Sequence, residues 1–345
     1  MIDLTSSTTP SPAMHCPPID PGIQWTSESI AIDAAPDNDL SPTPEASWSV
    51  DATRTGLCGA VSPRVVALPE GGYRLYYSQI LPRDGFPAGA NDYDNATTRI
   101  LSATSVDGMH WQPESGVRLS SQQGGAGDFR VVSSEVVPAI GDSGKLRMYF
   151  ESCPGTQSQQ NSIRSAVSDD GLNWEVEAGH RMAVDGCNLC APRIQFLDDG
   201  RCRLYFYQRS VGIMSAVSVD GIEFASEPGV RISDGGPNNR ITAFAPEILR
   251  LPDGRLRMYY AGYREGQSAD ILTALSEDGI DWQNDDELVH PPGSKSWDSA
   301  KCSEMCVVWD PRNVESGFQM LYEACDGTSP NNRGVWRIAL AVNSA

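Results

Sequence analysis

The sequence predicts an all-β protein, a five-bladed β-propeller whose ring is closed by an N-terminal strand that completes the last blade. Three observations support this fold class. A turn motif occurs four times, a strand motif occurs five times, and the chain ends before its last blade would be complete. We expect residues 1–22 to form a flexible leader and residues 23–345 to form a single propeller domain.

The turn motif has the form Ser-x-Asp-Gly-x-x-Trp, with Phe as the last residue of one copy, and it recurs every 50 to 63 residues. This spacing suits one propeller blade plus loop insertions. Asp-Gly is a strong hairpin-turn signal, because glycine adopts positive φ at little cost and Asp can bond its own backbone. Each copy therefore predicts a turn between two strands. The copies are Ser105–Trp111, Ser168–Trp174, Ser218–Phe224 and Ser276–Trp282.

Two strand motifs precede each turn. The nearer one combines Arg, an aliphatic residue and two aromatic residues, and its copies are 74–77, 147–150, 203–206, 257–260 and a degenerate 319–322. The earlier one is a first strand, often centred on Pro, at 62–66, 133–137, 191–195, 245–249 and 302–306. Turn residues separate the two motifs in four of the five copies. Five copies predict five blades, with the fourth strand of each blade after its turn.

The last predicted blade lacks a fourth strand at the C-terminal end of the sequence. Residues 337–342 match a third strand, but the protein ends at Ala345 before any fourth strand. Residues 20–32 resemble the turn and fourth strand of residues 107–119. We therefore expect residues of about 23 to 32 to complete blade five, so that no sheet edge stays open.

On the Ser-x-Asp-Gly-x-x-Trp turns and the Pro-centred first strands, the chain resembles the five-bladed propeller glycosidases. These include arabinanases, xylosidases, invertases, levansucrases and the mannoside phosphorylases. The resemblance spans nearly the whole chain, from about Ile23 to Ala345. It implies catalytic carboxylates on the innermost strands at the channel mouth, often an Asp directly before the Pro. Ser62, Ala191 and Ala245 occupy those positions here, so the resemblance assigns no catalytic residue.

Strand alternation directs the residue after each Pro toward the face that would line the channel. The resulting ring is Arg64, Glu135, Arg193, Glu247 and Glu304. In one interpretation these charges are structural salt bridges. In another, flanking arginines lower the pKa of Glu135, which acts as base or nucleophile, while Glu247 or Glu304 keeps a proton as general acid. In a third, Arg64 and Arg193 clamp a substrate carboxylate or phosphate.

Polar residues recur in the loops that enter the first strands. These could bind sugar hydroxyls at the rim, with Trp297 as a stacking platform, although Asp and Asn commonly cap turns. We expect the tryptophans of the turn motif to pack within the blades. The candidate rim residues are Asp128, Asp185, Arg240 and Asp298, with Asp51 and Asn239 in similar positions.

Composition excludes several classes of function. With 45 acidic and 26 basic residues, the chain carries a formal charge of −19, which repels nucleic acids and anionic membranes. No apolar run approaches the roughly 20 residues that cross a bilayer. The sequence also lacks a nucleotide-binding loop, a dinucleotide fingerprint and a serine-hydrolase motif.

Nine cysteines, without a secretion signal, favour reduced thiols in the cytoplasm. Cys187 with Cys190 and Cys302 with Cys306 have metal-like spacing but no nearby His, so we expect packing residues, no metal and no cofactor.

The leading hypothesis is a glycoside hydrolase that uses the channel carboxylates as acid and base, with an oligosaccharide or small-molecule substrate, neutral or anionic. Two alternatives stay open. The first is a lyase or cyclase that acts on an anionic metabolite on the same fold. The second is a non-catalytic sugar-binding propeller. Because fold does not fix function, the choice depends on the site.

Overall fold

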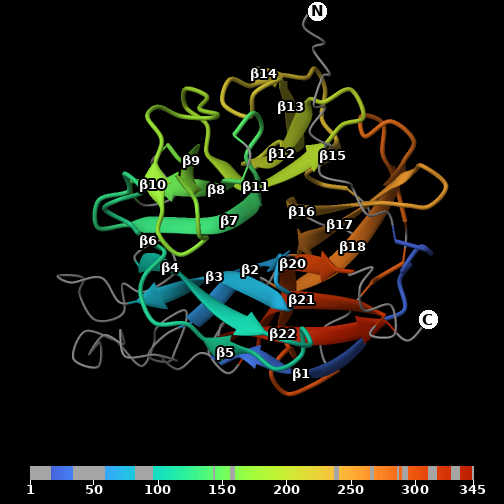
Figure 1. Cartoon of the computed structure of the whole chain (residues 1–345). Helices are drawn as coiled ribbons and strands as arrows, with labels where there is room; N and C mark the ends of the chain where they lie inside the picture. The colour runs from blue at the N-terminus through green and yellow to red at the C-terminus, as the bar shows by residue number, and fades with distance from the viewer. Residues whose placement is uncertain are drawn as a thin grey trace, which may run out of the picture.

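A computed structural model describes residues 17–33, 59–81, 96–142, 144–155, 160–236, 241–264, 268–285, 287–289, 294–309, 317–327 and 335–343. Within these residues the regular structure is β-strand throughout, and none of it is a helix that could span a membrane. The fold class predicted from the sequence, all-β, is therefore correct for the described residues (Figure 1). Most of the predicted leader, residues 1–16, lies outside them.

The strands form successive antiparallel groups. The first group contains β2 (Gly59–Ala67), β3 (Tyr73–Leu81), β4 (Thr97–Ser105), β5 (Gln112–Pro113) and β6 (Leu119–Ser120). The second group contains β7 (Arg130–Pro138), β8 (Leu146–Cys153), β9 (Ser162–Ser168) and β10 (Glu175–Val176). The third group contains β11 (Leu189–Phe196), β12 (Cys202–Gln208), β13 (Gly212–Ser218), β14 (Ala225–Ser226) and β15 (Ile232–Ser233). The remaining strands belong to one eight-stranded sheet, in the order β1 (Thr26–Ile32), β22 (Trp336–Asn343), β21 (Phe318–Cys325), β20 (Lys301–Val308), β18 (Ala269–Ser276), β17 (Leu256–Tyr263) and β16 (Thr242–Arg250), with β19 (Gln283–Asn284) also paired to β18. A parallel pair, Ala269 with Lys301, joins β18 to β20, so the sheet consists of two antiparallel groups, β16 to β19 and β20 to β22 with β1.

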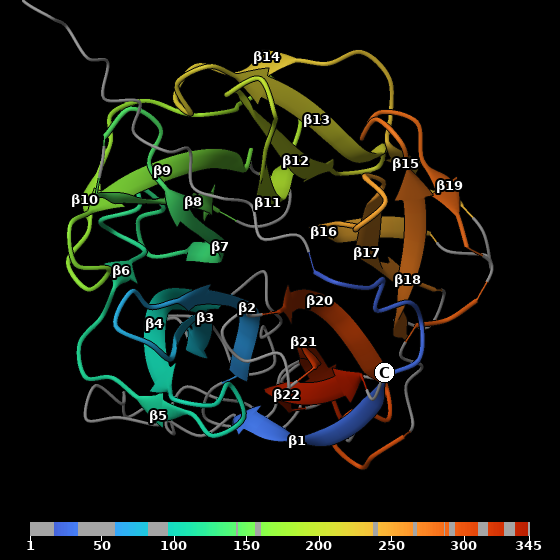
Figure 2. The ribbon, with the colours of Figure 1, turned by 45° about the vertical axis from the view of Figure 1, so that its right-hand side comes forward.

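The first strand of each group lies innermost, around a common centre (Figure 2). β2 contacts β7, β7 contacts β11, β11 contacts β16, β16 contacts β20, and β20 contacts β2. Residues on these five inner strands are therefore brought together although they are far apart in the sequence.

The N-terminal strand β1 pairs with the C-terminal strand β22. The pairing is antiparallel, with Thr26 opposite Val342 and Ile32 opposite Ile338. Ile32 is buried in the core that also contains Ile338 and Leu340. The sequence predicted this pairing, because the last group otherwise lacks a fourth strand.

The turn motif folds as its residues predict. In the second copy, the Asp170 carboxylate accepts hydrogen bonds from the backbone N–H groups of Leu172 and Asn173, both at 2.8 Å. Gly171 has a φ of 70°, which glycine adopts without strain. The Trp174 ring packs edge-on against Tyr76, with 5.9 Å between ring centroids. This tryptophan thus has the predicted packing role.

Each turn also docks onto the strand group before it. The Tyr149 hydroxyl donates to the Gly221 carbonyl at 2.8 Å, and Arg147 donates to the Asp220 carbonyl at 3.2 Å while binding Glu177 in its own group. Tyr76, Tyr205 and Tyr259 hold Gly171, Gly279 and Gly22 in the same way. At the degenerate position, Gln319 donates to the Asp107 carbonyl at 3.0 Å. The repeated Arg and Tyr of the strand motif therefore join neighbouring groups.

Candidate active site

A β-bulge interrupts every inner strand at the same height. In β2, Val61 is opposite Ser78 and Arg64 is opposite Tyr76, so Ser62 and Pro63 together face one residue of β3. β7, β11, β16 and β20 have register shifts at the matching place. The residue that begins the bulge has positive φ in four strands, at Ser62, Ser133, Ala191 and Ala245. Bulges of this kind change the direction of side chains, and here they direct two side chains of each inner strand, two residues apart, toward the centre at two levels.

Cross-strand pairing defines these two levels. Arg64, Glu135, Arg193 and Glu247 each lie opposite the first Tyr of the strand motif, namely Tyr76, Tyr149, Tyr205 and Tyr259. In β21 that position is Leu321, and its partner in β20 is Cys306. We call Arg64, Glu135, Arg193, Glu247 and Cys306 the ring layer. We call Ser62, Ser133, Ala191, Ala245 and Glu304 the bulge layer.

Glu304 is therefore two residues away from its predicted level. The prediction matched Ser303-Glu304 to Ser134-Glu135, because the two pairs are identical in sequence. Strand pairing instead aligns Glu304 with Ser133 and with Ser62, the position directly before the Pro. The physical reason is that hydrogen bonding to β21 sets the register of β20, which local sequence similarity does not reveal.

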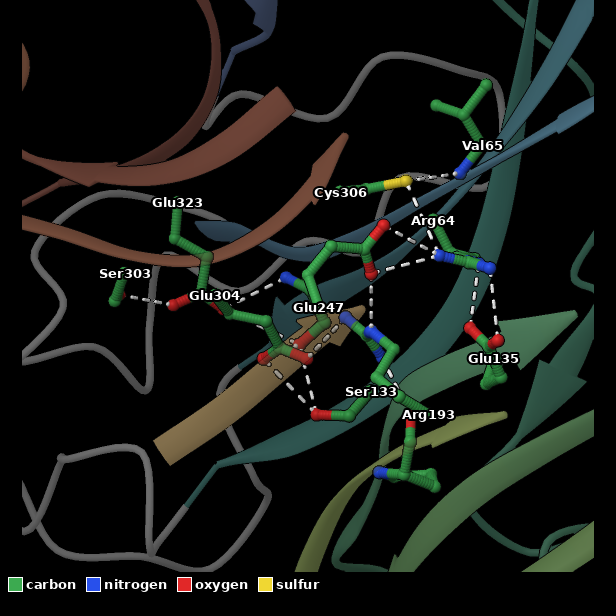
Figure 3. Close-up of polar contacts among 12 residues, drawn as sticks. Arg64, Val65, Ser133, Glu135, Arg193, Glu247, Ser303, Glu304, Cys306 and Glu323 are labelled. Carbon is green, nitrogen blue, oxygen red and sulfur yellow. Dashed lines mark hydrogen bonds and ion pairs between the residues drawn. The ribbon is translucent and has the colours of Figure 1, made fainter. Parts of the chain in front are cut away.

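The ring layer is a set of buried ion pairs (Figure 3). Arg64 binds Glu135 through Nε to Oε2 at 2.7 Å and Nη2 to Oε1 at 3.0 Å, and its Nη1 contacts Glu247 at 3.1 Å. Arg193 donates from Nε to Glu247 at 3.2 Å. The Cys306 Sγ accepts a contact from Arg64 Nη1 at 3.7 Å. Two arginines thus balance two glutamates, which favours the structural interpretation for this layer.

Burial dominates the electrostatics of the ring layer. It raises the pKa of Glu135, although Arg64 and Arg193 oppose the shift. The predicted net lowering of this pKa is therefore wrong: the arginines do lower it, but full burial of the carboxylate raises it more. Burial and the nearby Glu247 raise the pKa of Cys306 to about 11, so this thiol is protonated at neutral pH and is not an activated nucleophile.

Glu304 has different partners from the ring glutamates. Its Oε2 accepts hydrogen bonds from the Ser62 hydroxyl at 2.8 Å and the Ser133 hydroxyl at 3.2 Å. Its Oε1 lies 3.5 Å from Nη2 of Arg193. A hydroxyl can accept a hydrogen bond as well as donate one, whereas a guanidinium only donates. The surroundings of Glu304 can therefore accommodate either a charged or a protonated carboxyl group.

Glu323 also belongs to this cluster, and the sequence analysis missed it. It lies on β21, opposite Ser303, and is buried. Its Oε1 accepts the Ser62 backbone N–H at 2.9 Å, and its Oε2 accepts the Ser303 hydroxyl at 2.8 Å. The available signal was the Glu-x-Cys sequence that follows the aromatic residues in two second strands, at Glu323 and at Glu151.

Glu151 occupies in β8 the position that Glu323 occupies in β21. It is opposite Val132, accepts hydrogen bonds from Cys153 at 3.0 Å and Asn161 at 2.8 Å, and its pKa is raised by burial. Glu304 adds to that shift by charge repulsion. The bulge layer is therefore bordered by carboxyl groups on two second strands.

The predicted rim residues have varied environments. Asp298 is fully buried and caps its own turn, accepting hydrogen bonds from Ser294 at 2.9 Å and the Lys295 backbone at 2.8 Å. It also accepts a hydrogen bond from Tyr322 of β21 at 3.0 Å. Trp297 is half-buried and packs against the core. Asp128 and Asp185 are exposed in the loops before β7 and β11. Arg240, Asp51 and Asn239 lie outside the described residues.

Replacing Glu247 with Gln is expected to lower the free energy of unfolding by about 3–5 kcal/mol, because it breaks a buried ion pair that two arginines share. Its partners, Arg64, Arg193 and the Val307 backbone N–H, are all donors, so an amide NH₂ group would face donors. Urea denaturation measures the change.

The matched control for this variant is Asp198→Asn, which breaks the exposed pair between Arg250 and Asp198. We expect the control to leave the unfolding midpoint unchanged, because water screens exposed pairs. A Glu247→Gln protein as stable as the control would contradict the structural interpretation of the ring layer.

Comparison with known proteins identifies the fold. No model of a protein family matches the sequence, and no curated protein matches it either. Among solved structures, a thermostable family-43 glycoside hydrolase is similar at a TM-score of 0.62 and 17% identity, covering 85% of this chain and 91% of that one. The α-L-arabinofuranosidase of Podospora anserina, solved with cellotriose, is similar at 0.62 and 13%, covering 94% and 97%.

A third solved structure shows that the fold is not confined to one reaction. It is an N-acetylgalactosamine deacetylase from F. plautii in complex with blood group B trisaccharide, with a TM-score of 0.61, 15% identity and coverage of 92% and 94%. At these identities the comparisons show a shared fold, the one expected from the resemblance to propeller glycosidases. The chemistry has to be argued from the site.

Proposed function

We propose that this chain, whose fold is that of glycoside hydrolases, is a five-bladed propeller that acts on carbohydrates by hydrolysing a glycosidic bond. Of the three glutamates expected at the site, Glu135, Glu247 and Glu304, we propose Glu304 as the acid–base group. The observation that carries the proposal is the level of Glu304, which strand pairing aligns with the position before the Pro. That is the position at which the resembling glycosidases often carry a catalytic Asp.

The three glutamates differ in what their contacts allow. Glu135 and Glu247 accept hydrogen bonds from Arg64, so we assign them to orienting this guanidinium and to balancing charge. Glu304 is bound by two hydroxyls and can take up or release a proton as its neighbours rotate. A glycosidase needs one carboxyl that protonates the leaving oxygen and one carboxylate that acts as base or nucleophile. We therefore place the proton transfer at Glu304.

A second candidate function has one observation in its favour. The ring layer pairs its charges internally, as a non-catalytic sugar-binding propeller would allow. The same pairing weakens the case for a lyase or cyclase that clamps an anionic metabolite, because both arginines already bind carboxylates.

The test is a panel of 4-nitrophenyl glycosides that includes the α-L-arabinofuranoside, the β-D-xylopyranoside and the anionic β-D-glucuronide. We expect the wild-type protein to release nitrophenol from at least one neutral glycoside, and calorimetric titration with the free sugars to show binding. Binding without release across the panel would support the non-catalytic alternative. Release from the glucuronide alone would support an anionic substrate.

A further inference from the structure

The Ser62 hydroxyl lies between two carboxyl groups. Its Oγ is 2.8 Å from Oε2 of Glu304 and 3.5 Å from Oε1 of Glu323 (Figure 3 shows both glutamates). The two side chains come from paired strands, β20 and β21, and both are buried. Because they share one hydroxyl, their carboxyl groups can be no further apart than the roughly 9.5 Å that separates paired carboxylates in inverting glycosidases.

A serine hydroxyl can pass a proton between two such groups. It has one proton to donate and can accept a hydrogen bond at the same time. When Glu304 is protonated, it donates to Ser62, and Ser62 donates to Glu323. When Glu323 is protonated, the two hydrogen bonds reverse. One proton can therefore be held on either carboxyl when the Ser62 and Glu323 side chains shorten their 3.5 Å contact to hydrogen-bond length.

The local structure fixes Ser62 and Glu323 relative to each other. The Ser62 backbone N–H donates to Glu323 at 2.9 Å, and Ser303, the residue before Glu304, donates to Glu323 at 2.8 Å. Ser62 has a φ of 57°, a conformation that costs energy for a residue other than glycine. Ala191 and Ala245 have φ values of 50° and 51° at the same level, so the backbone there does not require a hydroxyl.

We propose that Glu323 is the proton-sharing partner of Glu304, coupled to it by the Ser62 hydroxyl, and that the two residues form the acid–base pair of the site. The reaction in this proposal rests on the proposed function, whereas the sharing of the proton does not. Other charged groups that face the pair are Arg193 of β11, next to Glu304, and Glu151 of β8. Arg193 contacts the other oxygen of Glu304, and Glu151 accepts from Cys153 and Asn161. The Ser62 hydroxyl also lies 3.4 Å from the Ser133 hydroxyl, which is uncharged.

The proton balance of the reaction follows from this coupling. When the shared proton is on Glu323, Ser62 gives its own proton to Glu304 while taking the proton of Glu323, so Glu304 becomes protonated and Ser62 stays a neutral hydroxyl. Glu304 then gives this proton to the leaving-group oxygen as the glycosidic C–O bond breaks, which leaves both carboxyl groups ionised. Water attacks the anomeric carbon, forms the new C–O bond, and returns its proton to the carboxylate pair. One bond is broken by one water, and the pair ends with the protons with which it began.

The first test needs no substrate. The infrared spectrum of each variant is subtracted from that of the wild type at neutral pH. A protonated carboxyl group that the wild type has and the variant lacks then gives a carbonyl-stretch band in the difference. We expect the same neutral-carboxyl band in the differences for Glu304→Gln and Glu323→Gln, because each leaves a single carboxylate that ionises without its partner. Ser133→Ala removes a hydroxyl from Glu304 but leaves the Ser62 bridge, so its difference spectrum should lack that band.

The second test separates proton transfer from folding. Ser62→Ala introduces the residue that occupies this conformation in β11 and β16, so we expect it to fold even if Glu323→Gln does not. Both variants should lower kcat on an alkyl glycoside about 10²-fold or more, with little loss on the 2,4-dinitrophenyl glycoside, whose leaving group needs no proton. Ser78→Ala, a buried serine at the β3 position equivalent to Glu323, is the control for removing a hydroxyl.

The outcomes distinguish the two levels of the proposal. A shared band without cleavage of any glycoside would support the proton sharing and reject the proposed function. The opposite result has two parts: Glu323→Gln and Ser62→Ala cleave glycosides with the wild-type dependence on the leaving group, and the Glu323→Gln difference spectrum has no neutral-carboxyl band. That result would reject the pair and leave the proposed function intact.

Discussion

Replacing Glu304 with Gln is expected to lower kcat by about 10²- to 10⁴-fold, the usual contribution of a general acid or base. We expect little change in stability. The partners of its Oε2 are the Ser62 and Ser133 hydroxyls, which can rotate to accept from the new amide, and the oxygen of the amide can face Arg193. KM should stay near its wild-type value, because the amide preserves the size and shape of the side chain.

The comparison that decides this prediction is with Glu247→Gln, whose partners are all donors. Steady-state kinetics and thermal unfolding of the two variants should show opposite patterns. Glu304→Gln should lose turnover and keep its melting temperature, whereas Glu247→Gln should lose stability. If Glu304→Gln melts well below the wild type and its activity follows only the folded fraction, Glu304 is structural and the catalytic assignment is wrong.

Deleting residues 1–35 is expected to abolish cooperative folding. The deletion removes β1 and leaves β22 with an unpaired edge and the core around Ile338 exposed where Ile32 packs. It also removes Asp20, whose carboxylate binds Arg257 at 2.7 and 2.6 Å, and Ser27, which contacts Asp298 at 3.2 Å. These contacts join the beginning of the chain to two strand groups near its end.

Circular dichroism melting and size-exclusion chromatography measure this effect. The control is deletion of residues 1–15, all of which belong to the predicted leader, and it should unfold at the wild-type temperature. Adding a synthetic peptide of residues 17–35 to the longer deletion should restore part of the transition if pairing with β22 is what was lost. A cooperative, wild-type-like transition in the longer deletion alone would contradict the prediction.

Repetition made much of the fold predictable from the sequence. A Gly that must adopt positive φ, an Asp that accepts backbone N–H groups and a Trp that packs on a neighbouring Tyr have to recur wherever the same turn recurs. The same argument located the N-terminal strand, because a last group without a fourth strand leaves an open edge. The convergence of Arg64, Glu135, Arg193 and Glu247 also followed, because their strands share one motif and one register.

Register and burial could not be obtained in this way. The sequence of β20 matches that of β7 best when Glu304 is aligned with Glu135, yet pairing with β21 places Cys306 in the ring layer and Glu304 beside Ser62 and Ser133. Full burial reverses the expected pKa shift of Glu135, which its charged neighbours alone would have lowered.

The sequence by itself thus determined the repeating strand groups and the charged residue types that meet at their centre. Only the tertiary structure decided which of those residues share a level, and that Glu323 of a second strand joins Glu304 across Ser62. The physical reason is that turn and packing chemistry act within a repeat, whereas the contacts of a buried side chain depend on cross-strand hydrogen bonds between segments far apart in the chain.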